Sequence, residues 1–439
     1  MLKVLKMENG GAQELKELIE GRTSRDLTSY QNRVDEIVKN VVRTGDMAVR
    51  EYTRRFDKVD LPAEKLLVSQ REIEDALAEV EDEFIKSLKL AAGKIESYHS
   101  KQSQNSWNMT EEDGVIMGQI CRPLERVGVY VPGGSAAYPS SVLMTVIPAK
   151  VAGVDEVIMV TPPTKEGKVN PYILTAARVA GVDKVYRIGG AQAIAALAYG
   201  TATINKVDKI VGPGNIYVSL AKRSVYGQVD IDMIAGPSEI LVIADESSNP
   251  RYLAADLLSQ AEHDPLAASI LVTTSERMAS EVEKEIALQI EELPRQQVIR
   301  ESINTYGRII LVNDLDQGVE IANRIAPEHL ELAVANPFKW MPKVRNAGAI
   351  FLGEYAPEPL GDYLAGPNHV LPTNGTARFF SPLSVRDYVK YSSYLSYSRE
   401  ALEEVKEEVI NLAEIEGLKG HANAIRVRFE GGKGEKSDL

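Results

Sequence analysis

A glutamate and a histidine that are neighbours in the chain have the side-chain types needed for acid–base chemistry. Glu328 and His329 lie in the segment IAPEHLEL, residues 325–332, which we interpret as the start of a helix. Consecutive side chains on a helix point in different directions, so the two cannot face a core together. One hypothesis is a pair of solvated polar residues. The other is two catalytic groups aimed at one small volume, with the His as general base and the Glu activating a water.

Four of the five histidines lie in the second half of the chain beside Asp, Glu or Gln, namely His263, His329, His369 and His421. The fifth, His99, lies in the charged segment KIESYHSKQ and is expected at the surface or as a cap. Gln260 and His263 are three residues apart, so near a helix end they share a face and could hold one cation. Asp362 is predicted to be a loop carboxylate, and one Asp with two His makes a reasonable zinc set. Spacing alone also allows structural hydrogen bonding for each of them.

Glycines follow three predicted strands, in VPGG (131–134), GGAQ (189–192) and GPGN (212–215). Ligands of open α/β sheets bind at the carboxyl ends of the strands, where glycines let backbone N–H groups approach and helix N-termini favour anions. This suits a phosphate-bearing ligand such as a dinucleotide. No G-x-G-x-x-G fingerprint is present. Two interpretations of these glycines therefore remain. They could form tight connections only, or they could line a binding site with Gln192 and Asn215 as its candidate polar groups.

The elements that must position these residues are predicted from periodicity. Residues 27–105 show helical spacing of apolar residues, and from about residue 126 short β-branched runs alternate with Ala-rich helices. A weak repeat, VAGVDEVIMV from 151, VAGVDKVYRI from 179 and VDKIV from 207, predicts a helix end at Ala-Gly, a turn and a buried strand. A second run from 237 predicts strands at 239–245, 269–275, 308–312 and 347–353, with helices between them.

This alternation predicts an α/β protein with two tandem Rossmann-like parallel-sheet modules. The helices of residues 27–105 should pack on one of them. After about residue 385, a charged helix, a Gly-Leu-Lys-Gly break and a short helix or strand form an arm that is too small for a core of its own. It must therefore pack on something else. Residues 431–439 are expected to be disordered.

Bulk composition limits the protein's partners and location. A chain of 439 residues should hold two or more domains, and its net charge of −13 argues against nucleic acid or an anionic membrane. The N-terminus lacks the apolar segment of a signal peptide, and the apolar stretch 141–155 is interrupted by Pro148 and Lys150. The single cysteine, Cys121, excludes internal disulfides and is interpreted as structural. We expect a cytoplasmic protein.

Eight segments in order make the chain resemble the histidinol dehydrogenase family from about residue 27 to 428. They are RVGVYVPGG, RIGGAQAIAALAYGT, IVGPGNIYV, DMIAGPSEI, LLSQAEHDP, IAPEHLEL, GDYLAGPNHVLPT and EGLKGHANAIRVR. The resemblance implies a zinc- and NAD-dependent enzyme that oxidises L-histidinol through histidinal to L-histidine with two NAD. This is the last step of histidine biosynthesis.

The resemblance also implies roles for individual residues. One Zn²⁺ per subunit is expected to bind the set Gln260, His263, Asp362 and His421. Glu328 and His329 match the acid–base pair, and Tyr130, Gln192 and Asn215 match the NAD contacts. Substrate contacts are expected at Ser238 and Glu416, together with the four zinc ligands and His329. His369 is expected to make loop hydrogen bonds rather than to be a fifth ligand.

The family is a homodimer, which implies that the arm, residues 385–430, reaches the neighbouring subunit and supplies His421 and Glu416 to its site. The domains expected are an N-terminal tail (1–26), a metal and substrate domain (27–130 with 237–384) and an NAD-binding domain (131–236). In the implied mechanism zinc holds the amino-alcohol, His329 removes the hydroxyl proton as hydride leaves, and Glu328 then activates water for the aldehyde step. The alternatives are a zinc hydrolase in which Glu328 activates a metal-bound water, and a non-enzymatic dinucleotide-binding or scaffold protein.

Overall fold

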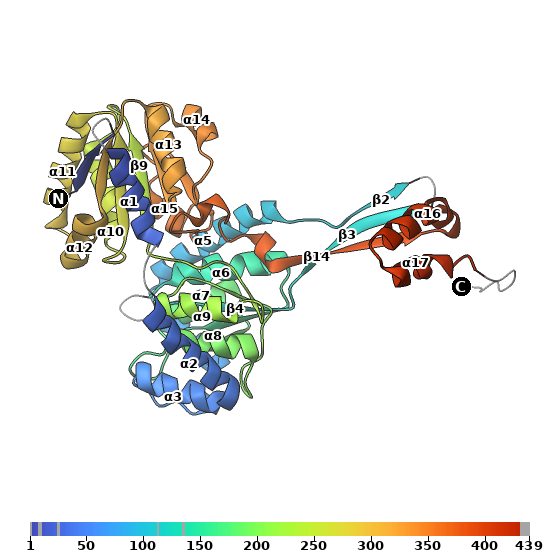
Figure 1. Ribbon diagram of the computed structural model, residues 1–439. Helices are drawn as coiled ribbons and strands as arrows, with labels where there is room; N and C mark the ends of the chain where they lie inside the picture. Colours follow the sequence, from blue (N-terminus) through green and yellow to red (C-terminus); the bar gives the residue numbers. More distant parts are fainter. Residues whose placement is uncertain (1, 8–10, 24–26, 112–113, 134–136, 431–439) are drawn as a thin grey trace. The chain divides into compact units, whose positions relative to one another are not determined.

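The chain divides into two compact units, each described here by itself. The computed structural model describes residues 2–7, 11–23, 27–111, 114–133 and 137–430. The first unit comprises residues 1–103 and 123–388, and the second comprises residues 104–122 and 389–439. Both parallel sheets belong to the first unit (Figure 1). Among the described residues, no helix combines the length and the apolar character needed to cross a membrane.

A five-stranded parallel sheet forms the first α/β module. Its spatial order is β6-β5-β4-β7-β8, and in chain order the strands are β4 (Arg126–Tyr130), β5 (Glu156–Val160), β6 (Lys184–Tyr186), β7 (Lys209–Val211) and β8 (Asp230–Ile231). The connecting helices are α6 (Pro139–Ala152), α7 (Pro171–Ala180), α8 (Gly190–Tyr199) and α9 (Ile216–Val225). The sequence repeat is confirmed, because α6 and α7 end at left-handed Gly153 and Gly181 and a strand follows each.

Four N-terminal helices cover this five-stranded sheet, namely α2 (Thr28–Thr44), α3 (Asp46–Phe56), α4 (Gln70–Ala78) and α5 (Asp82–His99). Val34 and Val49 share a core with Ile194 of α8, and Leu88 and Ile95 of α5 share another with the β4 side chains. The expected domain division grouped residues 27–130 with the other module. Their apolar faces instead match α8, whose residues Ala191–Ala198 are all buried and need cover on more than one side.

The second module is a six-stranded parallel sheet of order β1-β11-β10-β9-β12-β13. Its strands are β1 (Lys3–Lys6), β9 (Glu239–Ala244), β10 (Ala268–Thr273), β11 (Arg308–Leu311), β12 (His329–Ala333) and β13 (Ala349–Leu352). Its helices are α1 (Gly11–Thr23), α10 (Pro250–Ala261), α11 (Glu276–Ile290), α12 (Gln296–Tyr306), α13 (Leu315–Ile325), α14 (Pro337–Trp340) and α15 (Glu358–Tyr363). From β9 onward the strands follow the same order as in the first module, and β1 is added at one edge.

Two predictions in this module are wrong. The segment IAPEHLEL does not start a helix, because α13 ends at Ile325, Ala326 turns left-handed (φ 52°) and strand β12 begins at His329. Residues 1–26 are more than a tail. Residues 3–6 pair in parallel with β11, and Leu5 and Leu15 bury their side chains in the core. Positions 1, 8–10 and 24–26 lie outside the described residues.

The second unit combines β2 (Trp107–Glu111), β3 (Val115–Pro123) and β14 (Val389–Tyr397) with α16 (Arg399–Ile415) and α17 (Lys419–Arg426). The predicted helix, break and short helix of the arm are thus confirmed. Among its described residues, Ile410, Ala413 and Ala422 form a small buried cluster, with Ile425 packed against them. Cys121 is a free, partly buried thiol in β3. The expected disorder of residues 431–439 lies outside the described residues.

Short 3-10 turns complete the fold. They are η1 (Ala63–Lys65), η2 (Ser100–Gln102), η3 (Met341–Lys343), η4 (Thr376–Arg378) and η5 (Val385–Tyr388). The predicted class, two α/β modules with parallel sheets, is confirmed. In each sheet the strand order changes direction once, between β4 and β7 in the five-stranded sheet and between β9 and β12 in the six-stranded sheet. α/β sheets open a crevice at such switch points.

Candidate active site

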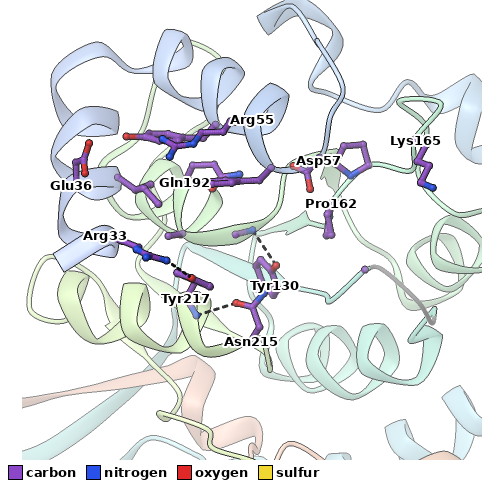
Figure 2. A pocket seen from close by; sticks show the side chains of 17 residues that line it. Arg33, Glu36, Arg55, Asp57, Tyr130, Pro162, Lys165, Gln192, Asn215 and Tyr217 are labelled. Carbon is purple, nitrogen blue, oxygen red and sulfur yellow. Dashed lines mark hydrogen bonds between the residues drawn. The ribbon is translucent and has the colours of Figure 1, made fainter. Parts of the chain in front are cut away.

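A cavity of about 840 Å³ lies at the carboxyl edge of the five-stranded sheet. Three polar residues at or after the ends of three different strands, Tyr130, Gln192 and Asn215, line this carboxyl-edge cavity (Figure 2). The sheet reverses its order between β4 and β7 at this edge. The three polar residues singled out in the sequence are therefore brought together where an α/β sheet binds ligands. Gly134 of the VPGG turn lies outside the described residues.

Each of the three side chains is fixed differently. The Tyr130 hydroxyl accepts a hydrogen bond from the Gly190 N–H at 3.1 Å, which ties the start of α8 to the end of β4. Burial raises the pKa of Tyr130 to about 12, so its phenol stays neutral. Asn215 caps α9, and its Oδ1 accepts from the Tyr217 N–H at 3.0 Å. The Oε1 atom of buried Gln192 has no hydrogen-bond partner among the described residues.

The GPGN turn is held by a buried ion pair that the sequence did not reveal. Gly212 has φ +110°, and a Cβ there would lie 2.2 Å from the Tyr130 carbonyl oxygen, so only glycine fits. The Asp232 carboxylate accepts from the Gly212 N–H at 2.8 Å, while Lys222 Nζ donates to the Gly212 carbonyl at 3.0 Å. Lys222 and Asp232 also pair with each other, both almost fully buried. This pair fixes the turn that leads to Asn215.

Helices α2 and α3 form the opposite wall of the carboxyl-edge cavity. They contribute Arg33, Arg55 and Asp57, and Lys165 lies on the β5 side. Arg33 Nη1 donates to the Tyr217 hydroxyl at 3.4 Å (Figure 2). Three cationic side chains around one cavity favour an anionic ligand. Sequence reasoning missed this wall because it comes from helices expected to pack on the other module.

A second cavity, of about 910 Å³, contains His329, Asp362 and His369 in its lining. It lies at the amino edge of the six-stranded sheet, because His329 is the first residue of β12. Gln260 and His263 reach the same edge, because α10 starts beyond the carboxyl end of β9 and ends just before β10 begins. This second cavity thus lies at the edge opposite to the carboxyl edge, where α/β sheets usually bind ligands.

His329 is a neutral base with a defined tautomer. Its Nδ1 lies 3.0 Å from the Glu239 carbonyl oxygen, and since a carbonyl only accepts, Nδ1 carries the proton. Nε2 is therefore unprotonated, and it has no hydrogen-bond partner among the described residues. Burial, together with the charges of His263 and His369, lowers the pKa of His329 to about 3. The imidazole is thus neutral and able to accept a proton.

The Glu328 carboxylate is directed at the start of β9 and stays close to the imidazole of its neighbour. Its Oε2 accepts from the Glu239 N–H at 2.9 Å and lies 3.8 Å from His329 Nδ1. The carboxylate is only 7% exposed. Glu328 therefore caps the start of β9 while His329 faces the amino-edge cavity, and Glu239 is bonded by both residues of the pair.

Carboxyl groups crowd around His329 Nε2. Glu358 Oε1 and Asp362 Oδ1 each lie 3.9 Å from this nitrogen. Burial and the nearby Asp362 raise the pKa of Glu358 to about 8, and burial raises the pKa of Asp362 to about 6. His263 lies close enough to oppose the rise at Glu358. Sequence reasoning missed Glu358. It lies one residue after a proline in a segment that looks like a loop, and nothing there distinguishes it from an exposed surface glutamate.

The donor set at this edge fits a divalent cation. His329, Glu358 and Asp362 offer ligand atoms within 4.8 Å of one another. Gln260 places its amide nitrogen 3.3 Å from His263 Nδ1, and its Oε1 is buried without a hydrogen-bond partner among the described residues. Imidazole and carboxylate donors with unpartnered buried atoms are typical of a zinc site.

Comparison with known proteins identifies the family. The histidinol dehydrogenase family model matches residues 20–429. The chain is 59% identical over 418 residues to a histidinol dehydrogenase of Clostridium acetobutylicum, covering 95% of this chain and 96% of that protein. The chain belongs to the histidinol dehydrogenase family. A Bacillus cereus histidinol dehydrogenase is 60% identical over 402 residues, covering 92% of this chain and 93% of that protein. The crystal structure of histidinol dehydrogenase from Elizabethkingia anophelis superposes with a TM-score of 0.90 at 38% identity, covering 98% of both chains.

The structure brings together only some of the metal and substrate residues that the resemblance to the histidinol dehydrogenase family implied. Gln260, His263 and Asp362 lie in the first unit, and Ser238 directly precedes β9 at the same edge. Glu416 and His421 are exposed residues of the second unit, at the end of α16 and in α17. The geometry of the first unit therefore includes neither of them, and their roles remain predictions.

The two histidines without a catalytic assignment are both structural. His369 places Nδ1 3.0 Å from the Asp362 carbonyl and Nε2 3.3 Å from Ser141 Oγ, so the expected loop hydrogen bonding is confirmed. The expected surface position of His99 is wrong. It is fully buried, with Nδ1 2.7 Å from Gln102 Oε1. His99 continues the buried stripe Leu88, Ala91 and Ile95 of α5, a spacing visible in the sequence.

Proposed function

We propose that this member of the histidinol dehydrogenase family oxidises L-histidinol through histidinal to L-histidine, with zinc and two NAD, as the last step of histidine biosynthesis. The observation that carries the proposal is His329, a neutral imidazole whose unpartnered Nε2 faces a cavity beside the candidate cation ligands. The family match over nearly the whole chain supports the substrate.

The proposed zinc ligands are Gln260, His263 and Asp362, with His421 from the second unit of a partner subunit. When bound, zinc supplies a Lewis acid that fixes the substrate, and NAD accepts hydride. Asp362 also belongs to the group that includes His329 and Glu358. We assign His329 to proton transfer because the Glu239 carbonyl holds its tautomer with Nε2 unprotonated.

In the alcohol step, His329 Nε2 accepts the proton of the substrate hydroxyl. The Nδ1–H bond to the Glu239 carbonyl orients the ring and stabilises the imidazolium that forms. In the aldehyde step, Glu328 removes a proton from the attacking water. The Glu239 N–H fixes the position of the Glu328 carboxylate, so both proton acceptors are held by the same residue.

The proposed NAD site is the carboxyl-edge cavity. Tyr130, Gln192 and Asn215 surround it from three strand ends, and Arg33 and Lys165 supply positive charge for phosphate groups. The positive φ of Gly212 shapes the turn that leads to Asn215 at this cavity.

A homodimer is proposed because the second unit cannot bury its own apolar surface. Leu395, Leu412 and Ile415 are 72%, 63% and 75% exposed, beside a core of very few residues. Exposed side chains of this size in one small unit are typical of an interaction surface. Packing on the partner subunit would bring His421 and Glu416 to the partner's site.

Reduced nicotinamide measured with histidinol, NAD and zinc-reconstituted protein tests the proposal. We expect two NADH for each histidinol consumed. Absence of NADH from protein with a full zinc complement would reject the dehydrogenase. Hydrolysis of ester or amide substrates without NADH would instead support the zinc hydrolase alternative, and NAD binding with neither activity would support a binding protein.

A further inference from the structure

Two buried acceptor atoms in the carboxyl-edge cavity lack donors. They are Oδ2 of Asp57 and Oε1 of Gln192, and neither has a hydrogen-bond partner among the residues that the structure describes. Both side chains line the cavity together with Tyr130, and the charge of Asp57 acts on the Tyr130 hydroxyl. Buried polar groups are normally hydrogen-bonded, so a ligand that donates two hydrogen bonds would satisfy both atoms.

The backbone around Asp57 holds the carboxylate at the cavity. The Asp57 N–H bonds to the Thr53 carbonyl at 2.9 Å and closes α3. Lys58 then turns left-handed with φ 63°, a conformation that L side chains rarely adopt. Its Nζ donates to the Arg55 carbonyl at 2.8 Å, which secures the turn. Backbone strain next to a buried carboxylate oxygen without a partner is typical of a binding site.

The position of Asp57 relative to the sheet identifies the ligand group. In Rossmann folds a carboxylate following the second strand bonds the adenosine ribose. Here the second strand, β5, is followed by Thr161-Pro162-Pro163, which contains no carboxylate. Asp57 enters the same cavity from α3, and Figure 2 shows it between Gln192 and Pro162. Asp57 therefore supplies this cavity with a carboxylate that Thr161-Pro162-Pro163 lacks.

We propose that Asp57, with Gln192 as second acceptor, binds the vicinal diol of the adenosine ribose and thereby selects NAD over a 2′-phosphorylated dinucleotide. This inference rests on the proposed function, in which NAD is the cofactor. A vicinal diol offers two O–H donors for two acceptor oxygens. A 2′-phosphate offers no donor and adds negative charge beside the carboxylate. Arg33, Arg55 and Lys165 remain for the pyrophosphate.

Dissociation constants measured by calorimetry at fixed salt for NAD, NADP and deamino-NAD test the inference. The variants are Asp57→Asn and, as a matched control, Glu36→Gln, which removes an exposed carboxylate from the same cavity. The wild type should prefer NAD. Asp57→Asn should reduce the NAD-to-NADP preference about tenfold or more, as expected for loss of a hydrogen bond to a charged group. Glu36→Gln should leave the preference within about twofold because its charge is screened by solvent.

Each contrary result has a separate meaning. An unchanged NAD-to-NADP ratio in Asp57→Asn, or an equal change in Glu36→Gln, overturns the ribose contact. Loss of discrimination between NAD and deamino-NAD, with the NADP ratio unchanged, assigns Asp57 to the adenine amine and also overturns it. Wild-type protein that oxidises no histidinol and binds neither dinucleotide rejects the proposed function itself. Asp57→Ser serves the same measurement if the Asn variant does not fold.

Discussion

The Lys222–Asp232 pair links stability to the geometry of the carboxyl-edge cavity. Their side chains are 3% and 1% exposed. Lys222→Met removes the cation and the donor to the Gly212 carbonyl, but leaves the Asp232 carboxylate with only two backbone N–H groups, those of Gly212 at 2.8 Å and Met233 at 2.6 Å. The variant therefore buries an uncompensated charge beside the turn that precedes Asn215.

The expected cost follows from that geometry. Breaking a buried pair by removing one partner costs about 3–5 kcal/mol, a large part of the roughly 5–15 kcal/mol that stabilises a domain. Asp232→Asn should cost a similar amount, because it leaves the Lys222 ammonium buried. In the double variant Lys222→Met/Asp232→Asn neither charge remains, and the Asn oxygen can still accept from the Gly212 N–H. Its cost should therefore fall to about 1–2 kcal/mol.

Urea unfolding of the three variants measures these free energies, and titration with NAD measures the cavity. We expect both single variants to bind NAD several-fold more weakly, because the Gly212 turn loosens, and the double variant to recover most of the affinity. The reasoning is refuted if Lys222→Met loses less than about 1 kcal/mol. It is also refuted if the double variant loses the sum of the two single losses.

Four further predictions address the site. Glu328→Gln, which keeps the acceptor for the Glu239 N–H, should slow the aldehyde step more than the alcohol step when each is assayed separately; equal loss rejects its water-activating role. His421→Asn mixed with Glu328→Gln should restore about a quarter of wild-type activity, because half of the dimers carry one intact shared site; no recovery in verified heterodimers contradicts sharing. Burial raises the pKa of Asp57 from 3.8 to about 6, so its destabilising effect is absent below about pH 4, grows between about pH 4 and pH 6 and is constant above that; Asp57→Asn should stabilise the ligand-free protein by about 1–2 kcal/mol at pH 7.5, after allowance for partial solvent screening, and not at pH 4. Chelation of zinc should lower the melting temperature and abolish activity, and added zinc should restore both. An unchanged melting temperature would argue that bound zinc does not stabilise the folded protein.

The sequence was sufficient for the elements that repeat. The two VAGVD segments place a Gly with positive φ at the end of α6 and α7 and a buried strand after each, because a left-handed cap and an apolar run are local properties. The strand β12 escaped prediction because Glu331 interrupts its apolar run. That carboxyl is buried and accepts from the Glu358 N–H at 2.9 Å, a partner more than twenty residues away in the chain.

Only those site residues that lie in family motifs could be predicted from the sequence. The motifs identified Gln260, His263 and Asp362, but not Glu358, Lys222 and Asp232. Their importance depends on burial and on partners from distant segments, as in the contact of Glu358 with His329 at 3.9 Å. Likewise, the wall that carries Arg33 and Asp57 could be placed only once α2 and α3 were seen to pack against α8.

The two modules share one strand order but carry their cavities at opposite edges, and helix electrostatics gives the two edges different ligand preferences. At the carboxyl edge of the five-stranded sheet, the N-termini of α8 and α9 face the cavity lined by Gln192 and Asn215. Their partial positive charge favours an anionic dinucleotide. At the amino edge of the six-stranded sheet, α10 ends at Ala261, between Gln260 and His263. The partial negative charge of a helix C-terminus, together with the carboxylates of Glu358 and Asp362, favours a cation. The same topology used at opposite edges can therefore supply one site for a phosphate-bearing cofactor and another for a metal.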